Sequence, residues 1–168
     1  MRFPTEGGRA YKASFCGVLA ALGLIFSYIE FLIPLPLAIP GIKLGLANIV
    51  VIVALYTLGE KYAFLVNITR IILAAALFGS VFSGLYALAG GLLSFACMVL
   101  LKKAGVFSVA GVSMAGGVFH NIGQLAIAAI VVGSLKVSYY FPVLLLSGMA
   151  TGIGVGVLAH FILKRLKS

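Results

Sequence analysis

The chain is made almost entirely of long apolar stretches, and six of them approach or reach the length of a bilayer-spanning helix. Such a helix needs about 20 apolar residues, with roughly 17 to 25 tolerated. The stretches cover residues 13–29, 44–58, 62–78, 81–101, 108–132 and 140–163. They are continuous and do not alternate with a period of two, which excludes a transmembrane barrel. We predict an all-α integral membrane protein, a six-transmembrane-helix bundle forming one domain over 1–168.

The composition excludes a soluble protein and most enzyme chemistry. Only 9% of the 168 residues are charged and 63% are hydrophobic, whereas soluble domains carry about a quarter charged residues. The acids are Glu6, Glu30 and Glu60, with no aspartate, so the carboxylate clusters that hold Mg²⁺-diphosphate are missing. No GxxxxGK[ST] phosphate loop occurs, and Cys16 and Cys97 lack metal-ligand spacing. We therefore predict no enzyme activity, no catalytic residue, no metal site and no cofactor.

The distribution of basic residues sets the predicted orientation. Lys and Arg concentrate on cytoplasmic connections, and with both termini inside, nine of the twelve fall on the inner face. These nine are Arg2, Arg9, Lys12, Lys61, Lys102, Lys103, Lys164, Arg165 and Lys167. The net charge of +9 is then a topology signal, and no soluble surface remains for nucleic-acid binding. We expect a multi-pass protein of the cytoplasmic membrane with cytoplasmic N- and C-termini.

One outer connection is long enough to cover a site. It spans residues 30–43, and its three prolines favour extended or turn backbone. The other connections are only a few residues long. We expect 30–43 to lie over the outer end of the bundle as a lid.

Arg70 is the clearest polar residue within a predicted span. It lies eight residues from either end of the third span, near the bilayer midplane. An arginine stays charged, so it needs an anionic partner or a wet cavity. Two interpretations remain: a cation that faces a ligand, or a structural arginine that pairs with Glu30 or snorkels to the interface.

Further polar residues predict a pocket open to the outside. His120 and Gln124 share one face of the fifth span, and Asn121 flanks them, so the three can line one wall. Asn48 lies one turn inside the second span, and Lys43 enters from the outer loop. The candidate ligand-binding residues are Lys43, Asn48, Arg70, His120, Asn121 and Gln124. Interhelical hydrogen bonding is the structural alternative. Asn67 and His160 are placed closer to the cytoplasm, outside this pocket.

Small residues mark candidate helix contacts, because they let helix backbones approach closely in lipid. Gly148, Gly152 and Gly156 on the last span favour internal packing, and Gly116 and Gly117 predict a fifth span that is bent, tilted or partly unwound. The first span has a stripe of Ala13, Gly17 and Ala21. For this stripe three alternatives stay open: docking a membrane partner, internal packing, or contact with lipid.

Two segments carry a family resemblance. Residues 40–48 (PGIKLGLAN) and 116–124 (GGVFHNIGQ) resemble the family described as Gx transporter or heptaprenyl diphosphate synthase component I. That family in turn resembles the substrate-binding S components of energy-coupling factor (ECF) transporters. The resemblance implies about six helices, a cytoplasmic N-terminus and a lid formed by the first outer loop. It also implies a first-helix AxxxA stripe that docks the coupling subunit, here with Gly17 in place of one alanine.

The leading hypothesis is therefore a non-enzymatic subunit that captures a small anionic or amphipathic ligand, vitamin-like or isoprenoid-like, from outside. Its implied partners are a membrane coupling subunit and ATPase subunits, which supply the driving force that this chain has no means to generate. The alternative is a non-transporting accessory subunit of isoprenoid, quinone or extracellular electron-transfer metabolism. A third hypothesis is a proton-linked carrier that uses His120.

Overall fold

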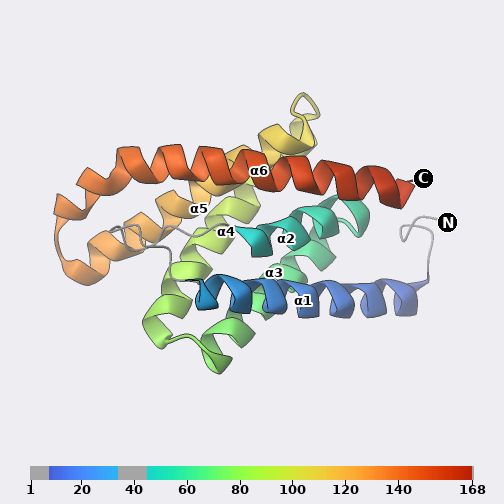
Figure 1. Cartoon of the computed structure of the whole chain (residues 1–168), viewed down its shortest axis with the longest axis horizontal. Coiled ribbons are helices and arrows are strands. Elements are labelled where there is room, and N and C mark those ends of the chain that lie inside the picture. The colour runs from blue at the N-terminus through green and yellow to red at the C-terminus, as the bar shows by residue number, and fades with distance from the viewer. Residues whose placement is uncertain (1–7, 34–44, 168) are drawn as a thin grey trace.

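The protein folds into six α-helices and one short 3₁₀-helix, as a computed structural model that describes residues 8–33 and 45–167 shows (Figure 1). The elements are α1 (Arg9–Leu32), α2 (Leu46–Thr57), α3 (Glu60–Leu77), α4 (Val81–Ala104), α5 (Val109–Val132), η2 (Leu135–Tyr140) and α6 (Phe141–Lys167). No strand occurs in the described ranges. The all-α fold predicted from the sequence is confirmed.

Local sequence explains where several helices begin and end. Ser80 accepts a hydrogen bond from the Ser83 backbone, and Ser83 reciprocates in a capping box that starts α4. Ser108 caps α5 through the Gly111 backbone N–H. Gly105 and Gly133 adopt left-handed backbone just after α4 and α5, where a residue without Cβ is unstrained. These signals keep the connections between α4, α5 and η2 short.

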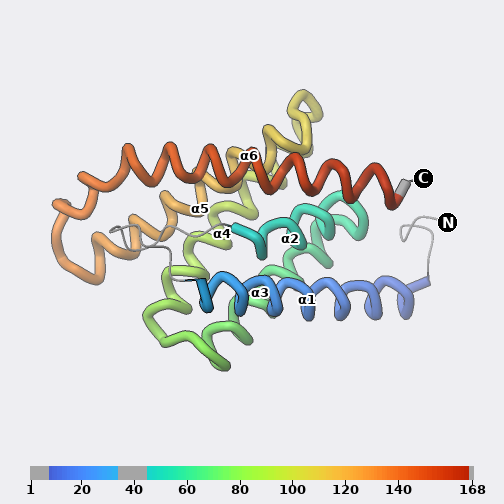
Figure 2. Tube along the Cα trace, in the orientation of Figure 1, coloured from blue at the N-terminus to red at the C-terminus, as the bar shows by residue number. Residues whose placement is uncertain are grey.

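Successive helices run in alternating directions along the bundle (Figures 1 and 2). The first turn of α1 and the last turn of α6 therefore lie at the same end, together with the α2–α3 and α4–α5 connections. That end carries Lys61, Lys102, Lys103 and Lys164, whereas Lys136 in η2 belongs to the opposite end. This charge asymmetry fits the predicted orientation, in which both termini are cytoplasmic.

Helix α2 forms the core of the protein. Every residue from Ile49 to Leu55 is buried, without the polar face that an outer helix of a soluble protein shows. The helix packs against α1, α3 and α6 and lies between α1 and α6 in Figure 1. Its 12 residues extend about 18 Å, well short of a hydrocarbon layer about 30 Å thick. Neighbouring helices thus enclose α2 and shield its ends.

Four helical segments are long and apolar enough to cross a membrane: Arg9–Leu32, Val81–Ala104, Val109–Val132 and Leu135–Leu166. The protein is therefore a multi-pass membrane protein. The 18-residue α3 carries three charged residues, Glu60, Lys61 and Arg70, and α2 is short. Neither helix is therefore both long and apolar enough to be counted as a membrane span. The count of six spans stays a prediction.

Glycines bring α4, α5 and α6 into close backbone contact. A Cβ at Gly156 of α6 would lie 2.6 Å from the Ala110 Cα of α5, and one at Gly123 of α5 would lie 2.7 Å from the Ala89 carbonyl of α4. Internal packing of the α6 glycines is thus confirmed. The expectation that α5 is partly unwound is wrong, because α5 is one continuous helix. Its glycines instead admit the neighbouring backbones.

The small-residue stripe on α1 faces outward. Ala13, Gly17 and Ala21 are all exposed, and a Cβ built at Gly17 would have no atom within 4 Å. A side chain at Gly17 would thus contact no described residue, which disfavours internal packing at this position. Docking of a partner and contact with lipid remain.

Candidate functional site

Arg70 lies inside the bundle, where α1, α2 and α3 meet. Its side chain is 7% exposed, so it does not snorkel to the surface. A Cβ on Gly23 of α1 would lie 3.2 Å from the Arg70 Cδ, so the missing side chain leaves room for the arginine stem. Placing a permanent charge at such a position is costly and usually marks a site or a pathway.

Two asparagines hold the arginine. Arg70 Nη2 donates to Asn48 Oδ1 of α2 at 3.0 Å and to Asn67 Oδ1 of α3 at 3.0 Å. Asn67 Nδ2 in turn donates to the Gly91 carbonyl of α4 at 3.1 Å. Because a guanidinium only donates, it fixes which amide atom of each asparagine faces it. Arg70 therefore ties α2, α3 and, through Asn67, α4 into one polar network.

Asn67 was expected nearer the cytoplasm, outside the site. The structure instead buries it beside Arg70. The two residues are three apart in α3 and so share a helix face, which is a signal present in the sequence.

Glu30 does not form the salt bridge considered for Arg70. Its Oε1 accepts a hydrogen bond from the Leu46 backbone N–H at 2.8 Å, which caps the start of α2. It interacts with Arg70 only at longer range, since no nitrogen–oxygen pair of the two lies within 4.0 Å. The Arg70 Nε–H is buried and has no hydrogen-bond partner among the described residues. Glu30 also lies within α1, which ends at Leu32, so the connection predicted from residue 30 starts later in the chain. Residues 34–43 of the predicted lid lie outside the described residues.

The polar residues of α5 do not share one wall, contrary to expectation. His120 and Gln124 face α4, where a Cβ at Gly90 would lie 3.1 Å from His120 Cε1 and 3.0 Å from Gln124 Cγ. Asn121 faces α6 and donates to the Leu144 carbonyl at 2.6 Å and to Ser147 Oγ at 3.4 Å. Consecutive helical residues point about 100° apart, which separates the two faces. Lys43 lies outside the described residues.

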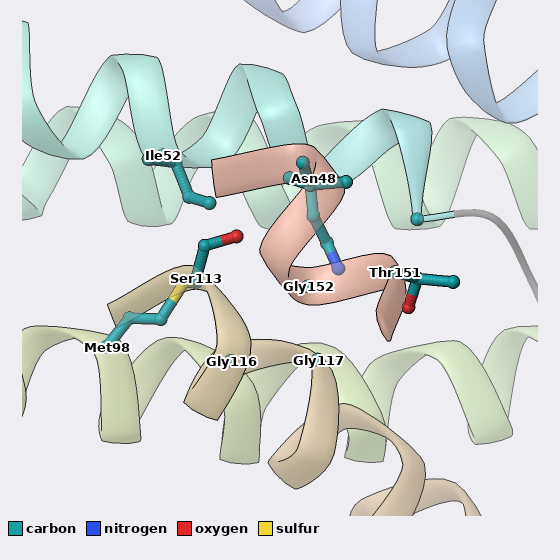
Figure 3. Close-up of a pocket in the computed structure, with 10 residues that line it drawn as sticks. Asn48, Ile52, Met98, Ser113, Gly116, Gly117, Thr151 and Gly152 are labelled. Atoms are coloured by element: carbon teal, nitrogen blue, oxygen red, sulfur yellow. The ribbon is translucent and has the colours of Figure 1, made fainter. Parts of the chain in front are cut away.

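Asn48 also lines a small cavity, to which Arg70 does not contribute (Figure 3). Helices α2, α4, α5 and α6 enclose it, and its volume of about 10 Å³ corresponds to roughly one water molecule. Its polar lining comes from Asn48, Ser113 and Thr151, and the lining residues are Gly45, Asn48, Ile52, Met98, Ser113, Gly116, Gly117, Thr151, Gly152 and Val155. Asn48 alone belongs to both this cavity and the set predicted from sequence. The backbone segment that carried the resemblance also supplies Gly45, Gly116 and Gly117.

The chemistry available here is binding. The described residues contain no group of three or more His, Cys, Asp or Glu side chains placed to hold a metal ion. What the bundle does offer is a buried cation, oriented amides and a hydroxyl-lined cavity within apolar surroundings, the usual makeup of a small-molecule site.

Comparison with known proteins gives one match. No match is found among curated proteins or among solved structures. The family model for heptaprenyl diphosphate synthase component I matches residues 19–162, which include α2, α3 and every residue of the polar network and cavity described above. The chain therefore belongs to the heptaprenyl diphosphate synthase component I family.

Proposed function

We propose that the protein is the substrate-binding membrane subunit of an ECF-type uptake transporter, and that it captures a small anionic or amphipathic ligand from outside. One observation carries this proposal: Arg70 is buried, fixed by Asn48 and Asn67, and no carboxylate of the described residues contacts it. A buried cation without a contacting counter-ion is a receptor for an anion, because ligand charge would offset the cost of its burial.

The position of the arginine supports capture from the outer side. Asn48 follows directly on the start of α2, at the end of the bundle where 34–44 joins α1 to α2. In the proposed six-span topology that end faces outward, and Lys43 of the same connection brings a second cation. His120 and Gln124 face α4 and Asn121 faces α6, so the proposal around Arg70 does not depend on these three residues.

The energy for uptake would come from partners. The exposed stripe of Ala13, Gly17 and Ala21 offers α1 a face on which another helix can approach closely. We assign this face to a membrane coupling subunit that works with ATPase subunits. In this assignment the chain itself carries out no catalysis and needs no cofactor.

The family description favours a second candidate. It refers to one component of heptaprenyl diphosphate synthase, which implies a complex of more than one subunit. Under this alternative the chain is a non-transporting membrane accessory of isoprenoid or quinone metabolism. The long prenyl chain of such an enzyme's substrate could pack against the apolar bundle, and its diphosphate could bind Arg70. The chain has no aspartate with which to hold Mg²⁺-diphosphate, so the catalytic part would have to be another chain.

Retention of small molecules by the purified protein tests the charge preference. We expect mass spectrometry to detect an anionic molecule that co-purifies with the wild-type protein and is lost from Arg70→Gln. Glutamine can still donate to Asn48 and Asn67, so the variant should insert and fold while lacking the charge. Removing a charged contact should weaken binding by at least tenfold.

Lys136→Gln is the matched control, because Lys136 is an exposed cation in η2, outside the Arg70 network. It should retain as much ligand as the wild-type protein. Equal retention by the Arg70 variant would show that the anion hypothesis is wrong. Co-purification of a prenyl-transferring subunit in place of an ATPase would favour the second candidate.

A further inference from the structure

The cavity beside Asn48 is lined by polar groups that no described residue satisfies. Asn48 Oδ1 is taken by Arg70, so the Asn48 Nδ2 must point the other way, into the cavity (Figure 3). Its amide N–H groups donate to no described residue. The hydrogen bond from Arg70 fixes this orientation of the Asn48 amide, because the reversed amide would place its N–H groups against the N–H groups of Arg70.

Ser113 contributes the second unsatisfied group. Its side chain is 2% exposed and lines the cavity, and its Oγ has no hydrogen-bond partner among the described residues. In Figure 3 the hydroxyl extends from α5 toward Ile52 of α2. A buried hydroxyl without a partner is destabilising, so a group that fills the adjoining space and bonds to it would stabilise the protein.

Thr151 completes the lining with an acceptor. It donates its own hydrogen to the Ser147 carbonyl at 2.9 Å, so only the lone pairs of its Oγ1 remain available. The cavity therefore offers donors from Asn48 and Ser113 and acceptors from Ser113 and Thr151. No charged side chain lines it. This set matches an uncharged hydroxyl, which both donates and accepts, and it disfavours an ionised oxygen.

We propose that this cavity is a hydroxyl-binding subsite. It holds the oxygen of one water molecule in the free protein, and the alcohol hydroxyl of the captured molecule takes that place in the complex. The volume of about 10 Å³ admits a single oxygen-sized group. The second half of this inference rests on the proposed function. It adds that the ligand carries a neutral hydroxyl in addition to its negative charge.

The first experiment compares Ser113→Ala with Ser94→Ala in the ligand-free protein. Ser94 is the matched control: it is also 2% exposed and its Oγ also lacks a partner, but it does not line the cavity. Deleting an unsatisfied hydroxyl should leave stability unchanged or raise it, whereas deleting one that binds water should lower it. We expect the unfolding equilibrium constant in detergent micelles to rise about fivefold for Ser113→Ala only. Equal effects of the two substitutions would overturn the subsite.

The second experiment identifies the source of the oxygen. An experimental map of the ligand-free protein should show one density peak within hydrogen-bond distance of Asn48 Nδ2 and Ser113 Oγ, and a dry cavity would overturn the proposal. With the co-purifying molecule bound, Ser113→Ala should reduce retention about fivefold if an alcohol occupies the site. Unchanged retention would overturn the alcohol half.

Failure of the subsite and failure of the proposed function give different patterns. If the function is wrong, Arg70→Gln leaves retention unchanged, while the stability difference between Ser113→Ala and Ser94→Ala persists. If the subsite is wrong, that difference disappears, while retention still depends on Arg70.

Discussion

Arg70 uses two of its five N–H groups on asparagine oxygens, and no carboxylate of the described residues contacts its charge. Neutral amides orient a guanidinium without cancelling its field. The sequence identified both Arg70 and Asn48, because polar residues are conspicuous in apolar spans. It could not pair them, since the rotation of α2 and α3 about their axes decides which side chains meet, and hydropathy does not encode that rotation.

Substituting Asn48 by aspartate tests whether the charge is available. The carboxylate keeps an acceptor for Arg70 and adds the missing counter-charge, so Asn48→Asp should raise the free energy of unfolding by about 1–2 kcal/mol. The same change should abolish retention of an anionic ligand. Denaturant titration and mass spectrometry measure the two effects.

Asn121→Asp is the contrasting control. Asn121 donates to the Leu144 carbonyl, so an aspartate there would set an acceptor against an acceptor and lower stability. If Asn48→Asp is destabilising as well, Arg70 is already neutralised by another group and the anion site is wrong.

Helix α2 is held at both ends by opposite charges from other helices. Glu30 of α1 accepts from the Leu46 N–H at its start, and Lys102 of α4 donates to the Leu55 carbonyl at 2.6 Å near its end. Lys102 also lies over the Tyr56 ring, 5.2 Å from its centroid. Negative charge at a helix start and positive charge at its end complement the helix dipole. A short helix buried in apolar surroundings thereby has its terminal groups satisfied.

Removing the charge at Glu30 should weaken α2. Glu30→Gln keeps an acceptor for Leu46 N–H but loses the interaction with the helix dipole and with Arg70, so we expect unfolding to become easier by about 1–2 kcal/mol. Glu60→Gln serves as the control, because Glu60 pairs with Lys103 at the exposed end of the bundle and should cost under about 1 kcal/mol. Equal costs in the same denaturant titration would contradict the buried capping role.

The helix boundaries were largely accessible from the sequence, whereas the depth of α2 was not. The sequence predicted short connections at 59–61, 79–80, 102–107 and 133–138. The observed helices leave 58–59, 78–80, 105–108 and 133–134 between them, because α3 begins at Glu60, α4 runs on to Ala104 and η2 takes up 135–140. Hydropathy treats 44–58 like any other apolar segment, yet the structure buries every residue from Ile49 to Leu55. Enclosure depends on which helices surround a segment, and that is a property of the assembled bundle. The same reasoning explains why the glycines of α5 suggested a partly unwound helix. They pack against α4 and α6, and the local sequence does not reveal those contacts.

The whole bundle leaves its small-residue stripe on the outside, so substitutions there test partner docking without disturbing the interior. Gly17→Leu should keep ligand retention, because a Cβ there meets nothing within 4 Å. It should prevent co-purification of the coupling and ATPase subunits, since leucine blocks close helix approach. Affinity purification from native membranes followed by mass spectrometry measures both.

Gly154→Leu on α6 is the matched control, because Gly154 is equally exposed and has equally open surroundings. It should leave the complex intact. Undiminished co-purification with Gly17→Leu would assign the α1 stripe to lipid and remove the main support for a partner-driven transporter.

The enclosure of α2 also bears on how the chain enters the bilayer during synthesis. In the six-span topology, α2 is too short to be recognised alone as a spanning segment, and α3 carries an arginine that costs about 2.5–3.5 kcal/mol at the centre of an inserting helix. Contacts between α2 and α3 offset part of these costs. The remaining capping and hydrogen-bonding groups belong to α1 and α4. The two helices that carry Asn48, Asn67 and Arg70 therefore become stable in lipid only after α4 has emerged, so insertion is completed by the same contacts that assemble the Arg70 network.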